Sequence, residues 1–167
     1  MKRLFYKEEL NMSLTVKSSY ALRALFELAV LTEDEGKEKV PISELSERQN
    51  IPKDFLEKIF IELRDAGIVK SVRGKFGGYA LAKNPKDLRL SEIIQVLDKP
   101  LQSFDCIVGE CSLEIECAVE FVWKRVNNSI MLELSKMTLQ DIIDYGRKIA
   151  KIKIAENEGG RLKKLNV

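Results

Sequence analysis

The sequence predicts a mainly α-helical protein that carries one two-stranded hairpin and one long helix in its second half. Along most of the chain, apolar residues recur every three or four positions, which is typical of amphipathic helices. Two short strand-like runs flank a glycine-containing turn, which is typical of a hairpin. The chain has 167 residues and is 45% hydrophobic, so it can bury one good core.

The composition excludes several classes of protein. The sequence has no histidine, which removes the commonest general base and the commonest imidazole metal ligand. We therefore expect that the protein is not an enzyme. No apolar run reaches the length of a membrane span, and residues 1–11 are charged without an apolar signal core. We expect a soluble, cytoplasmic protein with no membrane partner, in which residues 1–11 form an N-terminal extension and Met12 is an alternative start.

The first helix is expected at about residues 18–31, with Ser18 or Ser19 available as its N-cap. Its apolar residues fall at positions i, i+3, i+4 and i+7 and so share one face. These residues are Ala21, Ala24, Leu25 and Leu28. Residues 32–39, which mix charges with glycine, are expected to form a solvated loop.

Two short helices follow in close succession, at about residues 43–49 and 52–66. Asn50 suits the left-handed conformation that ends the first of them, and Pro52 suits the first turn of the second. The second helix carries an apolar stripe. The stripe consists of Leu56, Ile59, Phe60 and Leu63. Two short helices separated by a tight turn predict a helix-turn-helix.

A basic hairpin comes directly after this motif. Strands are expected at residues 68–72 and 79–82, joined by a turn at 73–78. Residues 69–89 hold six basic side chains and one acid, a local charge of +5. The basic residues are Lys70, Arg73, Lys75, Lys83, Lys86 and Arg89. A basic hairpin next to a helix-turn-helix predicts contact with phosphate, so residues 12–100 are expected to form a winged DNA-binding domain.

A helix capped by Ser91 is expected to run to about Asp98, and the long helix spans about residues 117–136. Its apolar stripe is Val119, Val122, Trp123, Val126, Ile130, Leu134 and Met137. A helix of this length measures about 30 Å, and so small a chain has little surface with which to cover it. We therefore expect a dimerisation helix.

We expect four residues of that helix to contact the partner subunit in a homodimer: Val119, Trp123, Val126 and Ile130. Helix-turn-helix proteins commonly pair so that two recognition helices reach major grooves about 34 Å apart, which predicts a palindromic operator. Thr138 and Asp141 resemble a capping box that opens a last helix. The dimerisation and last helices are assigned to residues 117–150, and residues 151–167 are expected to be a flexible tail.

All three cysteines, Cys106, Cys111 and Cys117, lie within 12 residues of a predicted loop at 101–118. An odd number of closely spaced intracellular thiols indicates a metal or redox site more than a disulfide framework. Because the tight Cys-x-x-Cys turn of zinc knuckles is missing, the spacing favours an iron-sulfur cluster. Inert buried thiols or simple redox thiols are the alternative. Residues 103–120 carry five acids and no base, which disfavours a nucleophilic thiolate but offers oxygen ligands.

The order of these elements, a winged helix-turn-helix, a cysteine loop and a long helix, resembles that of the Rrf-type family of transcription regulators. This family includes iron-sulfur, nitric oxide and cysteine-metabolism regulators. The resemblance covers about residues 12–145 and rests on five segments. They are Leu14–Arg23, Ile42–Ile51, Phe55–Phe60, Val72–Tyr79 and the cysteine loop. It implies a homodimer on double-stranded DNA, with the second short helix as the recognition helix.

The resemblance also implies which residues contact DNA. The recognition helix would present Lys53, Asp54, Phe55, Glu57 and Lys58, while Arg73 would enter the minor groove from the wing. Arg73 and Lys75 suit the negative potential of a narrow minor groove. Asp54 and Glu57 are repelled by phosphate, so at a base edge they must accept a hydrogen bond from a cytosine amino group. Phe55 can contact a thymine methyl group.

By resemblance, Cys106, Cys111 and Cys117 match the three cysteine ligands of cluster-binding members. The fourth ligand of such members is a histidine three residues after the third cysteine, where this chain has Glu120, or an acid in the first helix, where it has Ser19. Glu120 is favoured narrowly over Asp105, Ser19 or an exogenous molecule. Both a 2Fe-2S and a 4Fe-4S cluster remain open.

Three hypotheses for function follow. The first is a DNA-binding regulator whose operator affinity is set by an iron-sulfur cluster. The second is a cluster-free regulator of the same fold, controlled by thiol oxidation or by a partner protein. The third belongs to another class, a zinc-bound interaction module that does not bind DNA, and it predicts no salt-dependent DNA affinity.

Overall fold

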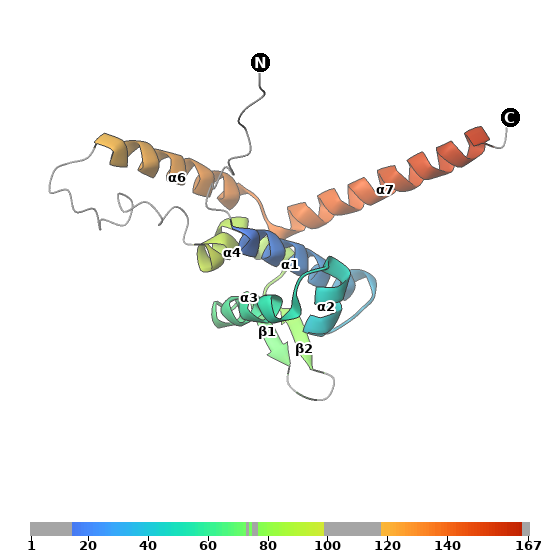
Figure 1. The fold of residues 1–167 in the computed structure, drawn as a ribbon, viewed down its shortest axis with the longest axis horizontal. Coiled ribbons are helices and arrows are strands. Elements are labelled where there is room, and N and C mark those ends of the chain that lie inside the picture. Colours follow the sequence, from blue (N-terminus) through green and yellow to red (C-terminus); the bar gives the residue numbers. More distant parts are fainter. Residues whose placement is uncertain (1–14, 73, 75–76, 99–117, 165–167) are drawn as a thin grey trace, which may run out of the picture.

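The computed structural model describes the backbone of residues 15–72, 74, 77–98 and 118–164, and the side chains of these residues except 118–120 and 154–164. Figure 1 shows a small helical domain from which two long helices project. The helices are α1 (Val16–Asp34), α2 (Ile42–Gln49), α3 (Lys53–Asp65), α4 (Leu90–Leu97), α6 (Ala118–Lys136) and α7 (Leu139–Lys164). The strands are β1 (Val69–Val72) and β2 (Gly78–Leu81), and a 3-10 turn spans Pro85–Asp87. The predicted fold class, mainly α with a two-stranded wing, is confirmed.

The predicted helix-turn-helix is formed by α2 and α3. Asn50 ends α2 in the left-handed conformation, with φ 49° and ψ 54°. The next amide, Ile51 N, donates to the Ser46 carbonyl over 3.0 Å, so the chain turns sharply into α3. The predicted stripe of α3 is fully buried against the core, with Leu56, Ile59, Phe60 and Leu63 each at 0% exposure. One face of α3 is therefore fixed in the domain and the opposite face is left to solvent.

The wing is a two-stranded antiparallel hairpin that pairs Val69 with Leu81 and Val72 with Gly78. It is tied to the segment before α2, because Tyr79 and Val40 exchange two backbone hydrogen bonds of 2.8 Å. A Cβ atom on Gly78 would lie 2.6 Å from the Val40 carbonyl oxygen, so glycine is required at this crossing. The wing thus leaves the domain in a defined direction, at the end opposite α6 and α7 (Figure 1).

The junction between α6 and α7 is docked on the domain beside α4. Leu90 N donates to the Met137 carbonyl over 3.0 Å, and Leu139 N donates to the Leu88 carbonyl over 2.9 Å. The predicted capping box is confirmed, since Thr138 N donates to Asp141 Oδ2 over 2.7 Å and Asp141 N donates to Thr138 Oγ1 over 3.3 Å.

The first half of α7 is held against α1. Ile143 is fully buried, and a Cβ atom on Gly146 would lie 2.7 Å from the ring of Phe26. Arg147 Nη2 pairs with Glu33 Oε2 over 3.0 Å and Asp34 Oδ1 over 2.5 Å at the C-terminal end of α1. None of the helices in the described ranges is both long and apolar enough to cross a membrane.

Three local expectations were wrong. Ser18 does not cap α1, because the N-cap is Thr15 and the Ser18 hydroxyl is buried against Asp98. Ser91 does not cap α4, because that helix begins at Leu90 with Arg89 at its N-cap. The last helix was expected to end by residue 150, but α7 continues to Lys164.

Candidate nucleic-acid interface and cysteine segment

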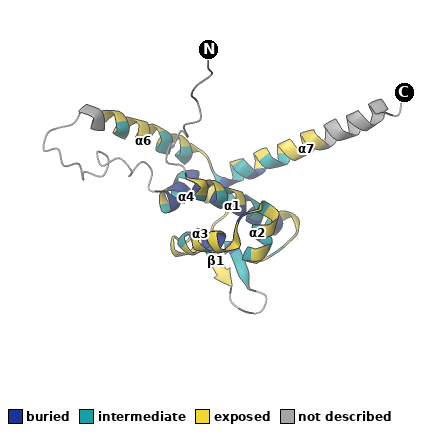
Figure 2. Cartoon of the chain, in the orientation of Figure 1, coloured by how far each residue is buried: buried dark blue, intermediate teal, exposed yellow. Residues whose placement is uncertain are grey.

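The solvent face of α3 carries the five residues that the sequence assigns to base and phosphate contact. Lys53, Asp54, Phe55 and Lys58 are exposed, and Glu57 is half-buried. Lys53 Nζ lies 3.6 Å from Glu57 Oε1, so this lysine partly neutralises the acid that phosphate would repel. The N-terminal half of the helix therefore exposes cations, an aromatic ring and carboxylates, residue types that contact bases and phosphates in a major groove. Figure 2 colours the exposed parts of α3 yellow.

The wing residues Arg73 and Lys75 lie outside the described residues, but the backbone around them is partly defined. Gly74 has φ +122°, a conformation that favours glycine. Gly77 N donates to the Gly74 carbonyl over 2.8 Å, and a Cβ atom on Gly77 would lie 2.6 Å from the Val72 carbonyl oxygen. Gly74 is therefore favoured by its backbone conformation, and Gly77 is required by the close approach of the Val72 carbonyl.

Two residues of α1 that sequence reasoning missed border the recognition face. The rings of Tyr20 and Phe55 meet edge to face, with centroids 5.9 Å apart and an interplanar angle of 83°. The Arg23 guanidinium carbon lies 5.7 Å from the centroid of the Tyr20 ring, and Arg23 Nε donates to Gln49 Oε1 over 3.2 Å. Tyr20 thus supports the exposed ring of Phe55. In the sequence, the only sign of this contact was that Tyr20 and Arg23 lie between the buried positions of α1.

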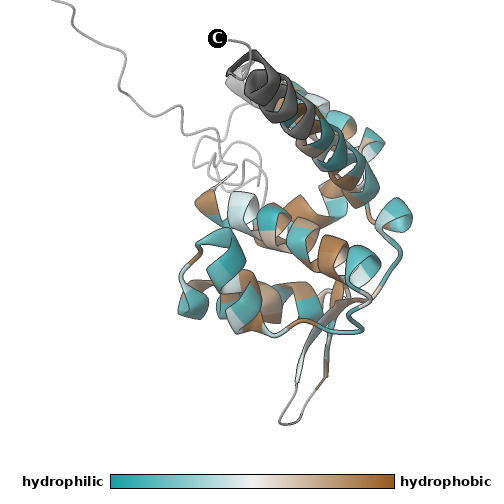
Figure 3. Ribbon diagram, turned by 90° about the vertical axis from the view of Figure 1, so that its right-hand side faces the viewer, coloured by the Kyte–Doolittle hydropathy of each residue, from teal (hydrophilic) through white to brown (hydrophobic). Residues whose placement is uncertain are grey.

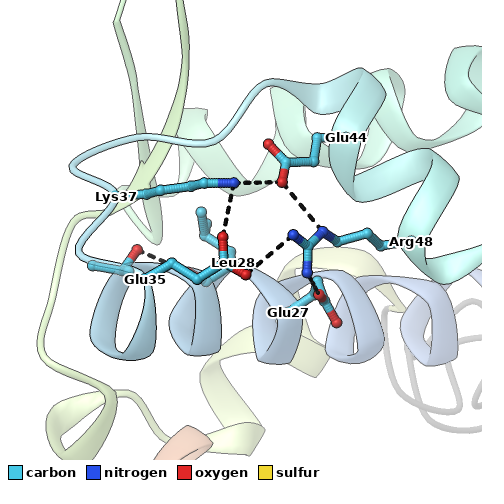
Figure 4. Close-up of polar contacts among 7 residues, drawn as sticks. Glu27, Leu28, Glu35, Lys37, Glu44 and Arg48 are labelled. Carbon is cyan, nitrogen blue, oxygen red and sulfur yellow. Dashed lines mark hydrogen bonds and ion pairs between the residues drawn. The ribbon is translucent and has the colours of Figure 1, made fainter.

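A group of ion pairs joins α1 and the loop after it to α2 (Figure 4). Arg48 pairs with Glu27 at 3.3 Å, Glu35 at 3.1 Å and Glu44 at 3.2 Å. Lys37 reaches Glu44 at 2.6 Å and Glu35 at 3.1 Å, and its hydrogen bond holds the pKa of the Glu35 carboxyl below its usual value. Single surface pairs contribute little, but these pairs share their charges in one network that adds to the packing of α1 against α2.

The predicted dimerisation residues lie on α6, where they are only partly covered. Val126 is 37% exposed, Trp123 and Ile130 are half-buried, and the Val119 side chain lies outside the described residues. Val122, at 49%, and Phe121, at 66%, extend the exposed apolar surface. A shallow groove runs between these side chains and Ile130. Phe121 was not part of the apolar stripe predicted from the sequence, so its place in this exposed surface was not predicted.

The three cysteines and Asp105 lie outside the described residues, as does the side chain of Glu120. In the sequence, the cysteine segment connects Asp98, at the end of α4, to Ala118, the first residue of α6. Glu120 is in the first turn of α6, and Ser19 is exposed on α1. Among the residues with described side chains, no three His, Cys, Asp or Glu groups are placed to hold a metal ion.

Known proteins with similar sequences and structures show which family this chain belongs to. A family model described as Rrf2, iron-dependent transcriptional regulator, matches residues 14–145. The chain belongs to the Rrf2 family. A helix-turn-helix regulator of Rhodobacter capsulatus named rrf2-like is 35% identical to it over 146 residues, which cover 83% of this chain and 97% of that protein.

Two solved structures of Rrf2-type proteins match both fold and sequence. The T. potens IscR structure has a TM-score of 0.65 at 34% identity and covers 83% of this chain and 91% of that one. The structure of CymR, titled the global cysteine regulator of B. subtilis, has a TM-score of 0.63 at 29% identity and covers 79% and 96%. The winged helix-turn-helix is thus confirmed, and this Rrf2 protein is a DNA-binding transcriptional regulator and not an enzyme.

Proposed function

We propose that this Rrf2 regulator is a homodimer whose affinity for a palindromic operator is controlled by an iron-sulfur cluster. The observation that carries the proposal is the donor set, three thiols within 12 residues of one segment that joins α4 to α6. The similarity to T. potens IscR supports it.

The residues present fit such a group. Three thiolates are the usual protein ligands of iron-sulfur clusters, and Cys106, Cys111 and Cys117 would supply them. Glu120, in the first turn of α6, would add an oxygen ligand, which binds iron more weakly than thiolate or imidazole does. When bound, the cluster supplies an iron centre that reacts with oxidants or nitric oxide. Both a 2Fe-2S and a 4Fe-4S form suit this donor set.

The chain's own residues provide DNA recognition. The first two turns of α3 would enter the major groove with Lys53, Phe55 and Lys58 outermost, because helix-turn-helix proteins read bases with the N-terminal part of this helix. Asp54 and Glu57 would accept from cytosine amino groups. Arg73 and Lys75 of the wing would lie in the minor groove.

A second copy of the chain would cover the exposed face of α6. Phe121, Val122 and Val126 together form an apolar surface on a helix that projects from the domain. Such a surface typically marks an interface, and pairing two α6 helices would place two recognition helices on one palindrome. Val126→Asp should convert the dimer to a monomer in sedimentation analysis, whereas Ile61→Asp, at a similarly exposed aliphatic residue of α3, should leave the dimer intact. A Val126→Asp dimer would contradict this interface.

The cluster is tested by iron and acid-labile sulfide content per chain, with a visible spectrum, on protein purified without oxygen. Matched iron and sulfide with a cluster spectrum would support the three thiols as ligands. Cys111→Ala should lose both, while the neighbouring Ser112→Ala should keep them. Equal loss in the two variants, or full retention in Cys111→Ala, would contradict the ligand assignment.

The similarity to B. subtilis CymR favours a second candidate, a regulator of the same fold controlled through its thiols or a partner protein without a cluster. It predicts colourless, iron-free protein that still binds the operator. The third hypothesis, a zinc module that does not bind DNA, has no support from a family of DNA-binding regulators.

A further inference from the structure

Asp98, the residue that ends α4, is buried at the N-terminal end of α1. Within the described residues only Asp98, at 5% exposure, and Ser18, at 2%, are buried polar side chains. Thr15 N donates to Asp98 Oδ2 over 2.9 Å, and Thr15 Oγ1 donates to Asp98 Oδ1 over 2.6 Å. The Ser18 hydroxyl also donates to Oδ2. One carboxylate therefore joins two helix ends that are about 80 residues apart in the chain.

Lys17 makes a second connection at the same place. Its Nζ donates to the Leu97 carbonyl at the end of α4 over 3.2 Å. The same ammonium pairs with Glu62 Oε2 over 2.7 Å, and Glu62 belongs to the recognition helix α3. The end of α4 is thus connected to α1 by Asp98 and to α3 by Lys17.

The position of Asp98 is tightly constrained, because a buried carboxylate is unfavourable unless its oxygens accept hydrogen bonds. Hydrogen bonds weaken steeply when the distance or angle departs from ideal values. A shift of Asp98 relative to α1 would therefore break several bonds at once and leave buried polar groups unpaired. Asp98 directly precedes residues 99–117, which include all three cysteines, so it is the described residue nearest in the chain to the thiols on that side.

We propose that Asp98 is a positioning residue that couples the occupancy of the cysteine segment to the recognition helix. A change in ligand state that displaces Asp98 would break its hydrogen bonds to Thr15 and Ser18 and so release this end of α1. Lys17 then passes the change in α1 to Glu62 on α3. This inference rests on the proposed function, because it needs a segment whose ligand state changes.

The test compares operator dissociation constants of cluster-loaded and iron-free protein, expressed as a ratio. Asp98→Ala removes all three hydrogen bonds. Asp98→Asn is the matched control, because its amide oxygen can accept from Thr15 N and Ser18 while its NH2 donates to the Thr15 hydroxyl. Lys17→Met removes only the connection to Leu97 and Glu62 and keeps an apolar stem. Hydrogen exchange at the Thr15 amide, which is itself a donor to Asp98, gives a readout independent of DNA binding.

In Asp98→Ala we expect iron and sulfide per chain to match the wild type, while the affinity ratio falls by about tenfold or more toward unity. Thr15 amide exchange should differ between loaded and iron-free wild type and become equal in Asp98→Ala. Asp98→Asn should restore both the ratio and the difference in exchange. Lys17→Met should lower the ratio and leave the Thr15 difference intact.

If Asp98→Ala folds and keeps the wild-type ratio of operator dissociation constants, the proposed coupling is overturned. If that variant does not fold, a wild-type ratio in Lys17→Met would overturn it, and a lowered ratio would support it. A wild-type protein with a ratio of one would instead refute the cluster-controlled function, so failure of the two proposals gives different results.

Discussion

The exposed ring of Phe55 gives the sharpest prediction about DNA recognition. An aromatic side chain offers about 200 Å² of surface to bury, so 38% exposure leaves about 75 Å² for DNA to cover. At about 25 cal/mol per Å², that surface is worth about 2 kcal/mol in full contact and about 1 kcal/mol when a thymine methyl group covers half of it. Phe55→Ala should therefore weaken operator binding by about 5- to 30-fold for each half-site that a protomer contacts.

The assay is fluorescence anisotropy at one fixed salt concentration, on an operator selected from random DNA. Each thymine is replaced in turn by deoxyuridine, which lacks the methyl group. At one thymine per half-site, replacement by deoxyuridine should lower the affinity of the wild type. The same replacement should not lower the affinity of Phe55→Ala any further. Tyr145→Ala is the control, an aromatic truncation at a side chain that is 66% exposed on α7. Unchanged affinity of Phe55→Ala, or additive losses at every thymine, would refute the reasoning.

Three further predictions address phosphate contact, the core and pH. Lys58→Ala should lower the slope of log affinity against log salt by about 1 per protomer, and an unchanged slope would exclude Lys58 from phosphate contact. Phe60→Ala should cost about 3–5 kcal/mol in urea unfolding, because the ring is fully buried and packs edge-on at 5.0 Å against Tyr79; a loss below about 1 kcal/mol would contradict this packing. Backbone and hydroxyl hydrogen bonds from Thr138 hold the pKa of Asp141 below its ordinary 3.8, so this carboxylate stabilises the fold above that value and loses its effect as the pH falls through the lower folded value. The difference in Tm between wild type and Asp141→Asn should accordingly shrink as acid is added below pH 3.8, and a constant difference would contradict the assignment.

The helix-turn-helix and the wing were predictable because their determinants are local. The stripe from Leu56 to Leu63 follows the helical period, and Asn50 suits the turn by its own conformational preference. The capping box of Thr138 and Asp141 joins residues only three positions apart, and it was also found from the sequence.

The features that were missed depend on contacts between distant residues. Ser18 looked like a helix cap because its partner Asp98, 80 residues away, is invisible in the local pattern. The support of Phe55 by Tyr20 is likewise a contact between separate helices. The continuation of α7 to Lys164 was missed because Gly159 and Gly160 disfavour helix locally.

The exposure of α6 was predictable in kind but not in detail. A long apolar stripe on a small chain predicted an uncovered face, and Val122 and Val126 are indeed exposed. Phe121, which is the most exposed apolar residue described on α6, lies outside that stripe. Which side of a helix faces its own domain is fixed by the docking of the α6–α7 junction on Leu88 and Leu90, and periodicity alone does not show that docking.

The measurement that tests the central claim most directly is operator affinity of one anaerobic preparation, before and after its iron is removed, at the same salt concentration. Iron and sulfide are determined on the same samples. The cluster-controlled mechanism predicts that affinity changes by about tenfold or more when iron is lost and returns when the cluster is rebuilt. Equal affinity of the loaded and iron-free protein would contradict it, because the cysteine segment would then have no influence on DNA binding.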